Sequence, residues 1–334
     1  MTMNRAQMGE FDLIEKYFKS RFAVDREDVP LGMGDDCALM TVTPGHQLAV
    51  STDVMVQGTH FFADVEPQTL GHKCLAVTLS DLAACGATPK AFTLALTLPS
   101  LQEDWLQAFA NGLYALAKAH GCALIGGDTT RGPLSIGITV FGEVPKGQGI
   151  KRSGAQVGDD LYVSGTLGDA RWALEALQGK IPMDAPTLLS TRARLEAPTP
   201  RVELGRGLRG LASAAMDLSD GLLGDLAHLL KASKKGARLD LRHMLNSPLM
   251  SACMKSSPAN EAIQRMLQGG DDYELLFAAP PSKRSAIETL SNALALPLTQ
   301  IGEVTDNEGV EWLHAQDLLG AQSIQDLGSY DHFL

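Results

Sequence analysis

The sequence predicts a two-domain fold of mixed α+β and α/β type. A chain of 334 residues is too long for one small core, so two domains are expected. In the first half, the predicted elements follow in the order β-α-β-α-β-β, an α+β pattern that allows hairpins rather than a regular βαβ repeat. A glycine-rich, basic stretch at residues 145–154 then predicts the domain link, so that the domains span residues 1–145 and 146–334.

The composition is that of an ordinary globular protein and argues against several partners. Hydrophobic residues make up 45% of the chain and charged residues 20%, close to the usual proportions. A formal net charge of -11 disfavours broad binding to nucleic acid or to an anionic membrane. The five cysteines form no C-x-x-C motif, which favours reduced thiols. No stretch has the pattern of a membrane span or a signal peptide, so we expect a cytoplasmic protein.

Helical and alternating spacings of apolar residues predict the elements of the first half in order. An amphipathic helix opens the chain, with apolar residues at Phe11, Ile14, Tyr17, Phe18 and Phe22. Strands are expected at 47–55, 90–99, 122–125 and 134–144, and helices at 69–86 and 103–120. The first of these strands is expected to end in a cluster of hydroxyl and carboxylate groups, Ser51-Thr52-Asp53.

The second half is predicted as a further series of short strands and helices. Strands are expected at 160–164, 212–217, 300–305 and 310–314, and a glycine turn at 269–272 leads into another. Helices are expected at 170–177, 185–196, 222–233 and 282–293, with one more from Arg201. The strand at 212–217 is buried and delivers Asp217 directly before the helix at 222–233.

The stretch at residues 124–133, Leu-Ile-Gly-Gly-Asp-Thr-Thr-Arg-Gly-Pro, is the central motif. A short apolar run ends at two glycines, and a carboxylate, two hydroxyls and a guanidinium follow at once. Paired glycines let a backbone approach a ligand closely, and turning amides can bind an anion. The neighbouring Asp128 would repel phosphate unless a divalent cation lay between them. The motif therefore predicts a metal–nucleotide site at the end of a strand.

Five more acidic motifs recur along the chain. They are Gly34-Asp35-Asp36, Ser51-Thr52-Asp53, Ser80-Asp81, Asp217-Leu218-Ser219-Asp220-Gly221 and Gly269-Gly270-Asp271-Asp272. Any one of them can be a polar turn or a helix cap, but six together indicate a shared role. Asp81 is the only charged residue between Lys73 and Lys90. A carboxylate on such an apolar helix is costly to bury unless it is paired or coordinated.

The residues favour phosphoryl transfer without a covalent intermediate. Neither a G-x-S-x-G motif nor a phosphate-binding P-loop is present. The protein-kinase motifs, a Gly-rich loop with a paired Lys and Asp-Phe-Gly, are absent too. Cys37, beside Asp36, is interpreted as the start of a buried strand. Carboxylates, hydroxyls and glycine turns suit hard cations that bridge phosphates, and phosphoryl transfer needs mainly positioning and charge neutralisation. These residues predict an Mg²⁺-dependent enzyme that uses ATP and leave the acceptor open.

Seven stretches carry a family resemblance. They are Gly9-Glu10-Phe11, Gly32-Met33-Gly34-Asp35-Asp36-Cys37-Ala38, Ser51-Thr52-Asp53 with His60, Leu79-Ser80-Asp81-Leu82-Ala83-Ala84, Ile125-Gly126-Gly127-Asp128-Thr129-Thr130, Asp217-Leu218-Ser219-Asp220-Gly221 and Tyr330-Asp331-His332-Phe333. They run in order from the N-terminus to the last residues. Together they closely resemble the thiamine-monophosphate kinase family, which is part of the aminoimidazole ribonucleotide synthetase superfamily.

The resemblance implies a fold and an activity. Residues 1–145 would bind ATP and Mg²⁺ and would pair with a dimer mate into a β-barrel at the interface, and residues 146–334 would form an α/β domain. The protein would be a homodimer that phosphorylates thiamine monophosphate to thiamine diphosphate with ATP and several Mg²⁺ ions. Neither nucleic acid nor a membrane would be a partner.

The resemblance also implies roles for single residues. The Mg²⁺ ligands would be Asp36, Ser51, Thr52, Asp53, Asp81, Asp128, Asp217 and Asp220. The positions that contact ATP would be Gly127, Asp128, Arg152 and Ser219, and those that contact thiamine monophosphate would be His60, Asp271 and Tyr330. The family often has Glu where this chain has Asp271, which puts the reach of that side chain in doubt.

Two alternatives stay open. One is another ATP-dependent enzyme of the superfamily, such as aminoimidazole ribonucleotide synthetase itself, which an assay with its amidine substrate would identify. The other is a non-catalytic acidic module that binds Mg²⁺ or Ca²⁺ without ATP. The second alternative does not explain the glycine turns beside the acids.

Overall fold

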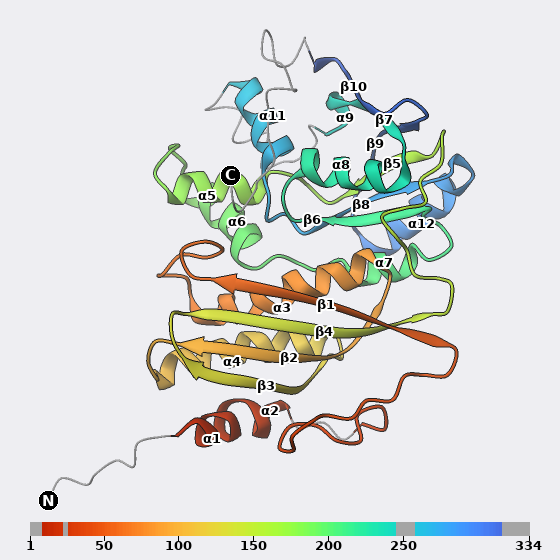
Figure 1. The fold of residues 1–334 in the computed structure, drawn as a ribbon. Coiled ribbons are helices and arrows are strands. Elements are labelled where there is room, and N and C mark those ends of the chain that lie inside the picture. The colour runs from red at the N-terminus through yellow and green to blue at the C-terminus, as the bar shows by residue number, and fades with distance from the viewer. Residues whose placement is uncertain (1–8, 23–25, 245–257, 316–334) are drawn as a thin grey trace, which may run out of the picture. The chain divides into compact units, whose positions relative to one another are not determined.

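The computed structural model describes residues 9–22, 26–244 and 258–315, which form two compact units (Figure 1). The first unit holds the chain up to Leu79 together with Pro89–Lys146. The second holds Ser80–Thr88 and the chain from Gly147 onward. Among the described residues, no helix is both long enough and apolar enough to cross a membrane.

The helix predicted near the N-terminus is present. It consists of α1 (Glu10–Leu13), a π-helical turn η1 (Ile14–Lys19) and α2 (Ser20–Phe22) in direct succession. Its buried residues are Leu13, Tyr17, Phe18 and Phe22. Phe11 lies at its exposed start, with 83% of its surface accessible. The helix therefore covers a core, as the spacing predicts, from its second turn onward.

An open four-stranded sheet forms the centre of the first unit. Its strands are β1 (His46–Val56), β2 (Thr88–Leu98), β3 (Ala123–Arg131) and β4 (Ser135–Pro145), in the spatial order β1-β4-β2-β3. Helices α3 (Pro67–Ala84) and α4 (Glu103–Ala119) lie on one face (Figure 1). The consecutive strands β3 and β4 are separated by β2, so they are not a hairpin. The sheet has two free edges, and the described residues of one chain do not close it into a barrel.

Two glycines allow the helices of this unit to pack closely. A Cβ atom on Gly71 of α3 would lie 2.1 Å from the carbonyl oxygen of Phe109. A Cβ atom on Gly112 of α4 would lie 1.7 Å from that of Gln68. No side chain fits at either position, so the two helix backbones touch directly. Fully buried side chains fill the space between helices and sheet: Leu75, Leu79, Phe92, Leu106, Phe109, Leu113 and Ile136.

A six-stranded sheet forms the centre of the second unit. Its strands are β5 (Asp160–Ser164), β6 (Ala214–Leu218), β7 (Gly236–Asp240), β8 (Glu274–Ala279), β9 (Leu298–Thr305) and β10 (Gly309–Leu313). Their spatial order is β10-β7-β9-β5-β8-β6. The pair β10–β7 is parallel, and the other pairs are antiparallel. All but β7 follow the predicted strands to within a few residues.

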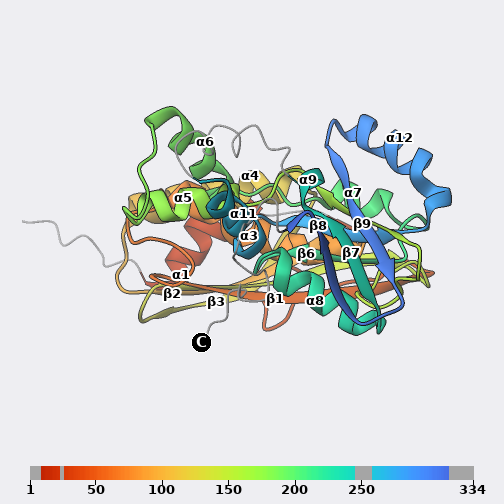
Figure 2. The ribbon, with the colours of Figure 1, turned by 90° about the horizontal axis from the view of Figure 1, so that it is seen from above.

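Helices border both faces of this sheet. They are α5 (Asp169–Leu177), α6 (Ala185–Glu196), α7 (Val202–Gly207), α8 (Leu222–Ser233), α9 (Leu241–Met244), α11 (Ala259–Gln268) and α12 (Arg284–Leu294), with a short 3₁₀ turn η2 (Pro281–Lys283). Figures 1 and 2 show α8 and α12 on opposite faces. The sequence predicts neither α9 nor α11.

Alternation along β6 places neighbouring residues on opposite faces of the sheet. Met216 and Leu218 of β6 pack in the core with Leu226 of α8. Asp217, between them, therefore points to the other face. On that face the ring of Tyr162 stacks on Phe277, with the ring centroids 5.1 Å apart. The fold thus delivers a carboxylate to a face of the sheet that the α8 core does not occupy.

Candidate active site

Three segments of the second unit meet around a pocket of about 190 Å³. The end of α3 contributes Asp81, the stretch after β4 contributes Arg152, and strand β6 contributes Asp217. The remaining lining residues are Ala84, Cys85, Ile150, Ala215 and Met216. The structure therefore brings together two of the predicted metal ligands and one predicted ATP contact, although 136 positions separate Asp81 from Asp217 in the chain.

Backbone hydrogen bonds hold these segments in place. The amide of Ile150 donates to the carbonyl of Cys85 at 3.0 Å, and the amide of Ala215 donates to the carbonyl of Lys151 at 3.0 Å. The stretch that carries Arg152 is thus bonded to the end of α3 on one side and to β6 on the other. Because the bonds are between backbone groups, the arrangement depends little on the side chains of the pocket.

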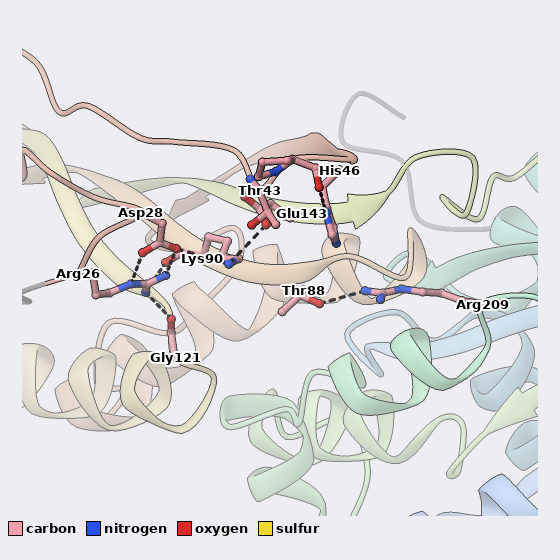
Figure 3. A network of polar contacts seen from close by, with 10 residues as sticks. Arg26, Asp28, Thr43, His46, Thr88, Lys90, Gly121, Glu143 and Arg209 are labelled. Carbon is pink, nitrogen blue, oxygen red and sulfur yellow. Dashed lines mark hydrogen bonds and ion pairs between the residues drawn. The ribbon is translucent and has the colours of Figure 1, made fainter.

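The guanidinium of Arg209 fixes the turn that follows α3. Its Nε donates to the carbonyl of Gly86 at 2.5 Å, and its Nη2 donates to the hydroxyl of Thr88 at 3.0 Å (Figure 3). Cys85 lies in this turn and Asp81 lies in the last turn of α3 directly before it, so the position of the turn limits the movement of both. Burial is the main reason why the pKa of Arg209 lies below its usual value.

Two predicted acidic motifs lie side by side at the end of β6. The amide of Asp271 donates to the carbonyl of Ser219 at 2.8 Å, and the amide of Tyr273 donates to that of Leu218 at 2.9 Å. Asp271 and Tyr273 have φ values of 66° and 49°, a conformation that non-glycine residues seldom adopt and that is often found at functional sites. The amide of Asp220 donates to the carboxylate of Asp225 at 3.1 Å. Ser219, Asp220 and Asp271 thus form one continuous loop region.

Asp272, which belongs to a predicted motif, and Glu274, which belongs to none, are buried with partners that the sequence does not predict. Glu274 is fully buried and accepts hydrogen bonds from Ser164 Oγ at 2.5 Å, Arg194 Nη2 at 2.6 Å and Arg201 Nε at 2.7 Å. Asp272 accepts from the amide of Gly168 at 2.7 Å, and burial raises the pKa of its carboxyl well above the usual value. The partners come from elements far apart in the chain, so no spacing rule pairs them.

Asp225 is another buried acid that the motifs do not reveal. It stands in the first turn of α8 and is 2% exposed. Burial raises the pKa of its carboxyl to about 7, although hydrogen bonds from the backbone of Asp220, Ser219 and Gly221 act in the opposite direction. The sequence signal that could have identified it is its place one turn beyond Gly221, where an acid can accept hydrogen bonds from the amides of the preceding loop.

The cluster Ser51-Thr52-Asp53 lies within β1 and not at its end. Because the strand continues to Val56, these residues alternate between the two faces of the sheet. Ser51 and Asp53 share a face with the buried Met55. Thr52 lies on the opposite face, where its hydroxyl bonds that of Thr139 on β4 at 2.8 Å. The expectation that the strand ends in this cluster is wrong, because β1 continues to Val56.

The motif at residues 124–133 also lies mainly inside a strand. Strand β3 continues to Arg131, so Asp128 is a strand residue, paired with Ala95 of β2. A Cβ atom on Gly127 would lie 1.9 Å from the carbonyl oxygen of Leu94. This glycine therefore permits close pairing with β2. The prediction of a turn at the end of a strand is wrong, because strand pairing uses these backbone groups.

The other predicted positions of the first unit lie in loops. Asp36 is exposed, and its amide donates to the side chain of Asp35 at 2.8 Å. Cys37 is exposed too, so its interpretation as the start of a buried strand is wrong. His60 Nδ1 accepts the amide of Val56 at 3.0 Å, which sets the orientation of the ring. Tyr330 lies outside the described residues.

The donor set suits Mg²⁺ that is completed by phosphate and water. Within the described part of the chain, no group of three or more His, Cys, Asp or Glu side chains is placed to hold a metal ion. The pocket nevertheless has two carboxylates, Asp81 and Asp217. Mg²⁺ is commonly bound by one or two carboxylates together with substrate phosphates rather than by a cage of protein groups.

Two family models match the chain. That of the AIR synthase related protein N-terminal domain matches residues 34–144, and that of the AIR synthase related protein C-terminal domain matches residues 156–313. Thiamine-monophosphate kinase of Salmonella typhimurium is 45% identical over 330 residues, which cover 97% of this chain and 98% of the relative. The match therefore extends over almost the whole length of both proteins.

Solved structures agree with these matches. The crystal structure of thiamine-monophosphate kinase from Stenotrophomonas maltophilia superposes with a TM-score of 0.84 at 45% identity, covering 92% of this chain and 97% of that one. A second structure, AaThiL complexed with AMPPCP and TMP, has a TM-score of 0.76 at 29% identity and covers both chains completely.

Proposed function

This chain belongs to the thiamine-monophosphate kinase family, and on that premise we propose that it transfers the γ-phosphoryl group of ATP to thiamine monophosphate and so forms thiamine diphosphate. The observation that carries the proposal is the pocket where Asp81, Arg152 and Asp217 meet. Support also comes from the similar structure that is complexed with AMPPCP and TMP. A phosphoryl transfer site needs anionic metal ligands and a cation for phosphate in one place.

We propose that Asp81 and Asp217 hold Mg²⁺ in this pocket. When bound, the metal would neutralise charge on the phosphates and polarise the transferred group. The carboxylates are acceptor-only groups when ionised, so they bind a cation and repel unshielded phosphate. The other proposed ligands, carried from the family resemblance, are Asp36, Ser51, Thr52, Asp53, Asp128 and Asp220.

We also propose separate sets of contacts for the two substrates. We assign the phosphates of ATP to Arg152, whose guanidinium can donate two parallel hydrogen bonds to a phosphate. Gly127, Asp128 and Ser219 are proposed as further ATP contacts. His60, Asp271 and Tyr330 are proposed contacts of thiamine monophosphate. Asp271 has a left-handed backbone conformation, and its side chain is one methylene shorter than the Glu that is frequent in the family.

We propose that the phosphoryl group passes directly between the substrates. A phosphate monoester has a second pKa near about 6, so the acceptor is already largely a dianion at neutral pH and needs no general base. Among the described residues, Cys85 is the one thiol that lines the pocket. Burial raises the pKa of that thiol, with a smaller opposite effect of Arg209. A raised pKa disfavours the nucleophilic thiolate, which supports a transfer that does not pass through Cys85.

We further propose a homodimer that closes the first sheet into a barrel. Strand β1 is an edge strand, and Leu48, Val50, Val54 and Val56 on one of its faces are exposed. An exposed apolar edge strand is a strong candidate for pairing with a second chain. In this proposal residues 1–145 form the ATP- and Mg²⁺-binding dimerisation domain and residues 146–334 form the α/β domain.

The direct test is an assay for thiamine diphosphate. Purified protein with thiamine monophosphate, ATP and Mg²⁺ should form thiamine diphosphate, measured by chromatography after conversion to a fluorescent thiochrome. Chelation of Mg²⁺ should stop the reaction, and Mg²⁺ in excess should restore it. ATP consumption without thiamine diphosphate, or product formation only from an amidine substrate, would refute the proposed acceptor.

A further inference from the structure

Four charged side chains form a cluster in the first unit that none of the predicted motifs contains. They are Arg26, Asp28, Lys90 and Glu143, which we call the clasp (Figure 3). Arg26 and Asp28 precede the loop at residues 31–39, whereas Lys90 lies on β2 and Glu143 on β4. The clasp therefore joins the base of a loop to the sheet, and that loop carries Asp36.

Arg26 is the centre of the clasp. Its Nε and Nη2 donate to the two carboxylate oxygens of Asp28 at 2.8 and 2.5 Å. Its Nη1 donates to the carbonyl of Lys90 at 3.0 Å and to that of Gly121 at 2.8 Å. One guanidinium thus connects the loop base to β2 and to the turn before β3. A lysine could not make these contacts together, because it lacks the planar fork.

Lys90 and Glu143 extend the clasp to the far side of the loop. The ammonium of Lys90 lies 3.4 Å from Asp28 and 3.4 Å from Glu143. Glu143, which is 4% exposed, accepts the amide of Thr43 at 2.8 Å. Thr43 follows the loop, as Arg26 precedes it. Both ends of the segment are therefore fixed to the sheet, and partial burial makes such pairs stronger than exposed ones.

The loop between these ends is closed at its base but exposed at its tip. The amide of Leu39 donates to the carbonyl of Leu31 at 2.9 Å, and the amide of Thr41 donates to that of Asp28 at 2.9 Å. Val29 packs with Ala91, Ala123 and Ile125 beneath the base. Residues 34–37 at the tip are exposed. The position of the tip is therefore set by the base to which it is attached.

We infer that Arg26 and Asp28 are positioning residues that hold Asp36 where it can bind the metal–nucleotide complex. The inference rests on the proposed function in one respect, that Asp36 is a metal ligand. If the loop adopts its binding position for only a fraction of the time, the apparent affinity for the metal falls by that fraction. Loss of the clasp should thus weaken metal binding without any change in the ligands themselves.

The test compares five variants of the whole protein, of which Arg26→Lys is the conservative one. Arg26→Met and Asp28→Asn break the clasp, and Asp36→Asn removes the proposed ligand. Arg238→Met is the matched control, because Arg238 also bonds two carboxylates, Glu303 at 2.9 Å and Glu311 at 2.8 Å, on another sheet. Binding of Mn²⁺ in the presence of a non-hydrolysable ATP analogue is measured by electron paramagnetic resonance, and exchange of the amides of residues 31–41 by mass spectrometry.

Arg26→Met and Asp28→Asn should weaken Mn²⁺ binding about 3- to 10-fold and should speed amide exchange at Leu39 and Thr41, while Arg238→Met should change neither. Arg26→Lys should restore only part of the affinity, since it keeps the charge and loses the fork. If Asp36→Asn weakens binding but the clasp variants do not, the positioning role is refuted and the proposed ligand stands. If Asp36→Asn has no effect on binding, Asp36 is not a ligand and the inference is overturned together with that part of the proposed function.

Discussion

Two carboxylates, those of Asp81 and Asp217, line the pocket of the second unit. Asp217 is 5% exposed on a strand whose neighbours are apolar, and Asp81 stands at the end of an apolar helix. Both side chains border the pocket that also contains Arg152. Such a position is better explained by ligand binding than by stability, and the two roles respond differently to substitution.

Asp81→Asn and Asp217→Asn should separate binding from folding. Each change keeps the shape of the side chain and removes its charge, so thermal unfolding should remain within a few degrees of the wild type. Turnover should fall by roughly 10²-fold or more, the scale observed when one charge partner of a transition state is removed. Paired measurements of kcat and Tm check this. A variant that unfolds early but keeps normal turnover while folded would assign the residue to stability.

Asp28 should make the stability of the fold sensitive to acid. Hydrogen bonds from Arg26 lower the pKa of its carboxyl below the usual 3.8, although burial opposes them. Because the folded pKa lies below the unfolded one, the stabilisation is complete above about pH 4 and is lost as the pH falls through the folded pKa. The free energy of unfolding, measured with urea between pH 3 and 7, should therefore fall less steeply toward low pH for Asp28→Asn than for the wild type. Equal slopes would show that the ion pair does not stabilise the folded state.

At the level of elements, the sequence predicts which segments are helices and strands better than it predicts where strands end. Strand β5 and helices α6 and α8 have the predicted bounds. Strand β7 is not predicted, because Gly236–Asp240 has no apolar alternation strong enough to mark it. Strand β3 continues through Gly126 and Gly127, which look like a turn in the sequence. Pairing with β2 decides their conformation, and pairing is a tertiary effect.

The same limit applies to the candidate site. The acidic motifs identify Asp81 and Asp217, and the pocket brings them together. Glu274 and its two arginines are not identifiable, because burial and partners from α6 and the start of α7 define them. The predicted strand at 47–55 already includes Thr52 and Asp53, and alternation along it places them on opposite faces. Residue types thus indicate which groups a site can bind, whereas the tertiary partners of each side chain are known only from the structure.

Substitutions on the exposed face of β1 should change the oligomeric state of the protein. Val50 is 54% exposed and Val54 is 53% exposed, and fully burying one such side chain contributes roughly 1.5–3 kcal/mol. Val50→Lys combined with Val54→Lys should convert a dimer into a monomer of 35.6 kDa in sedimentation equilibrium. Leu189→Glu on α6, where 73% of the leucine is exposed, is the control and should leave the mass unchanged. A wild-type protein that is itself monomeric at micromolar concentration would contradict the proposed dimer.

At the level of the whole molecule, the chain combines a family match over 97% of its length with a pocket that has charges of both signs. Phosphoryl transfer between two anions needs positioning and relief from repulsion more than covalent chemistry. Burial raises the pKa of the Cys85 thiol, the one thiol that lines this pocket among the described residues. Both observations favour a ternary complex in which ATP and the acceptor are bound together.

The stereochemical course at phosphorus tests direct transfer most directly. ATP made chiral at the γ-phosphorus by sulfur and oxygen isotopes is incubated with the protein and thiamine monophosphate, and the configuration of the terminal phosphorus in the thiamine diphosphate formed is determined. A single in-line displacement predicts inversion, and Cys85→Ala should give the same configuration. Net retention, which requires two displacements and a phosphorylated enzyme, would contradict direct transfer.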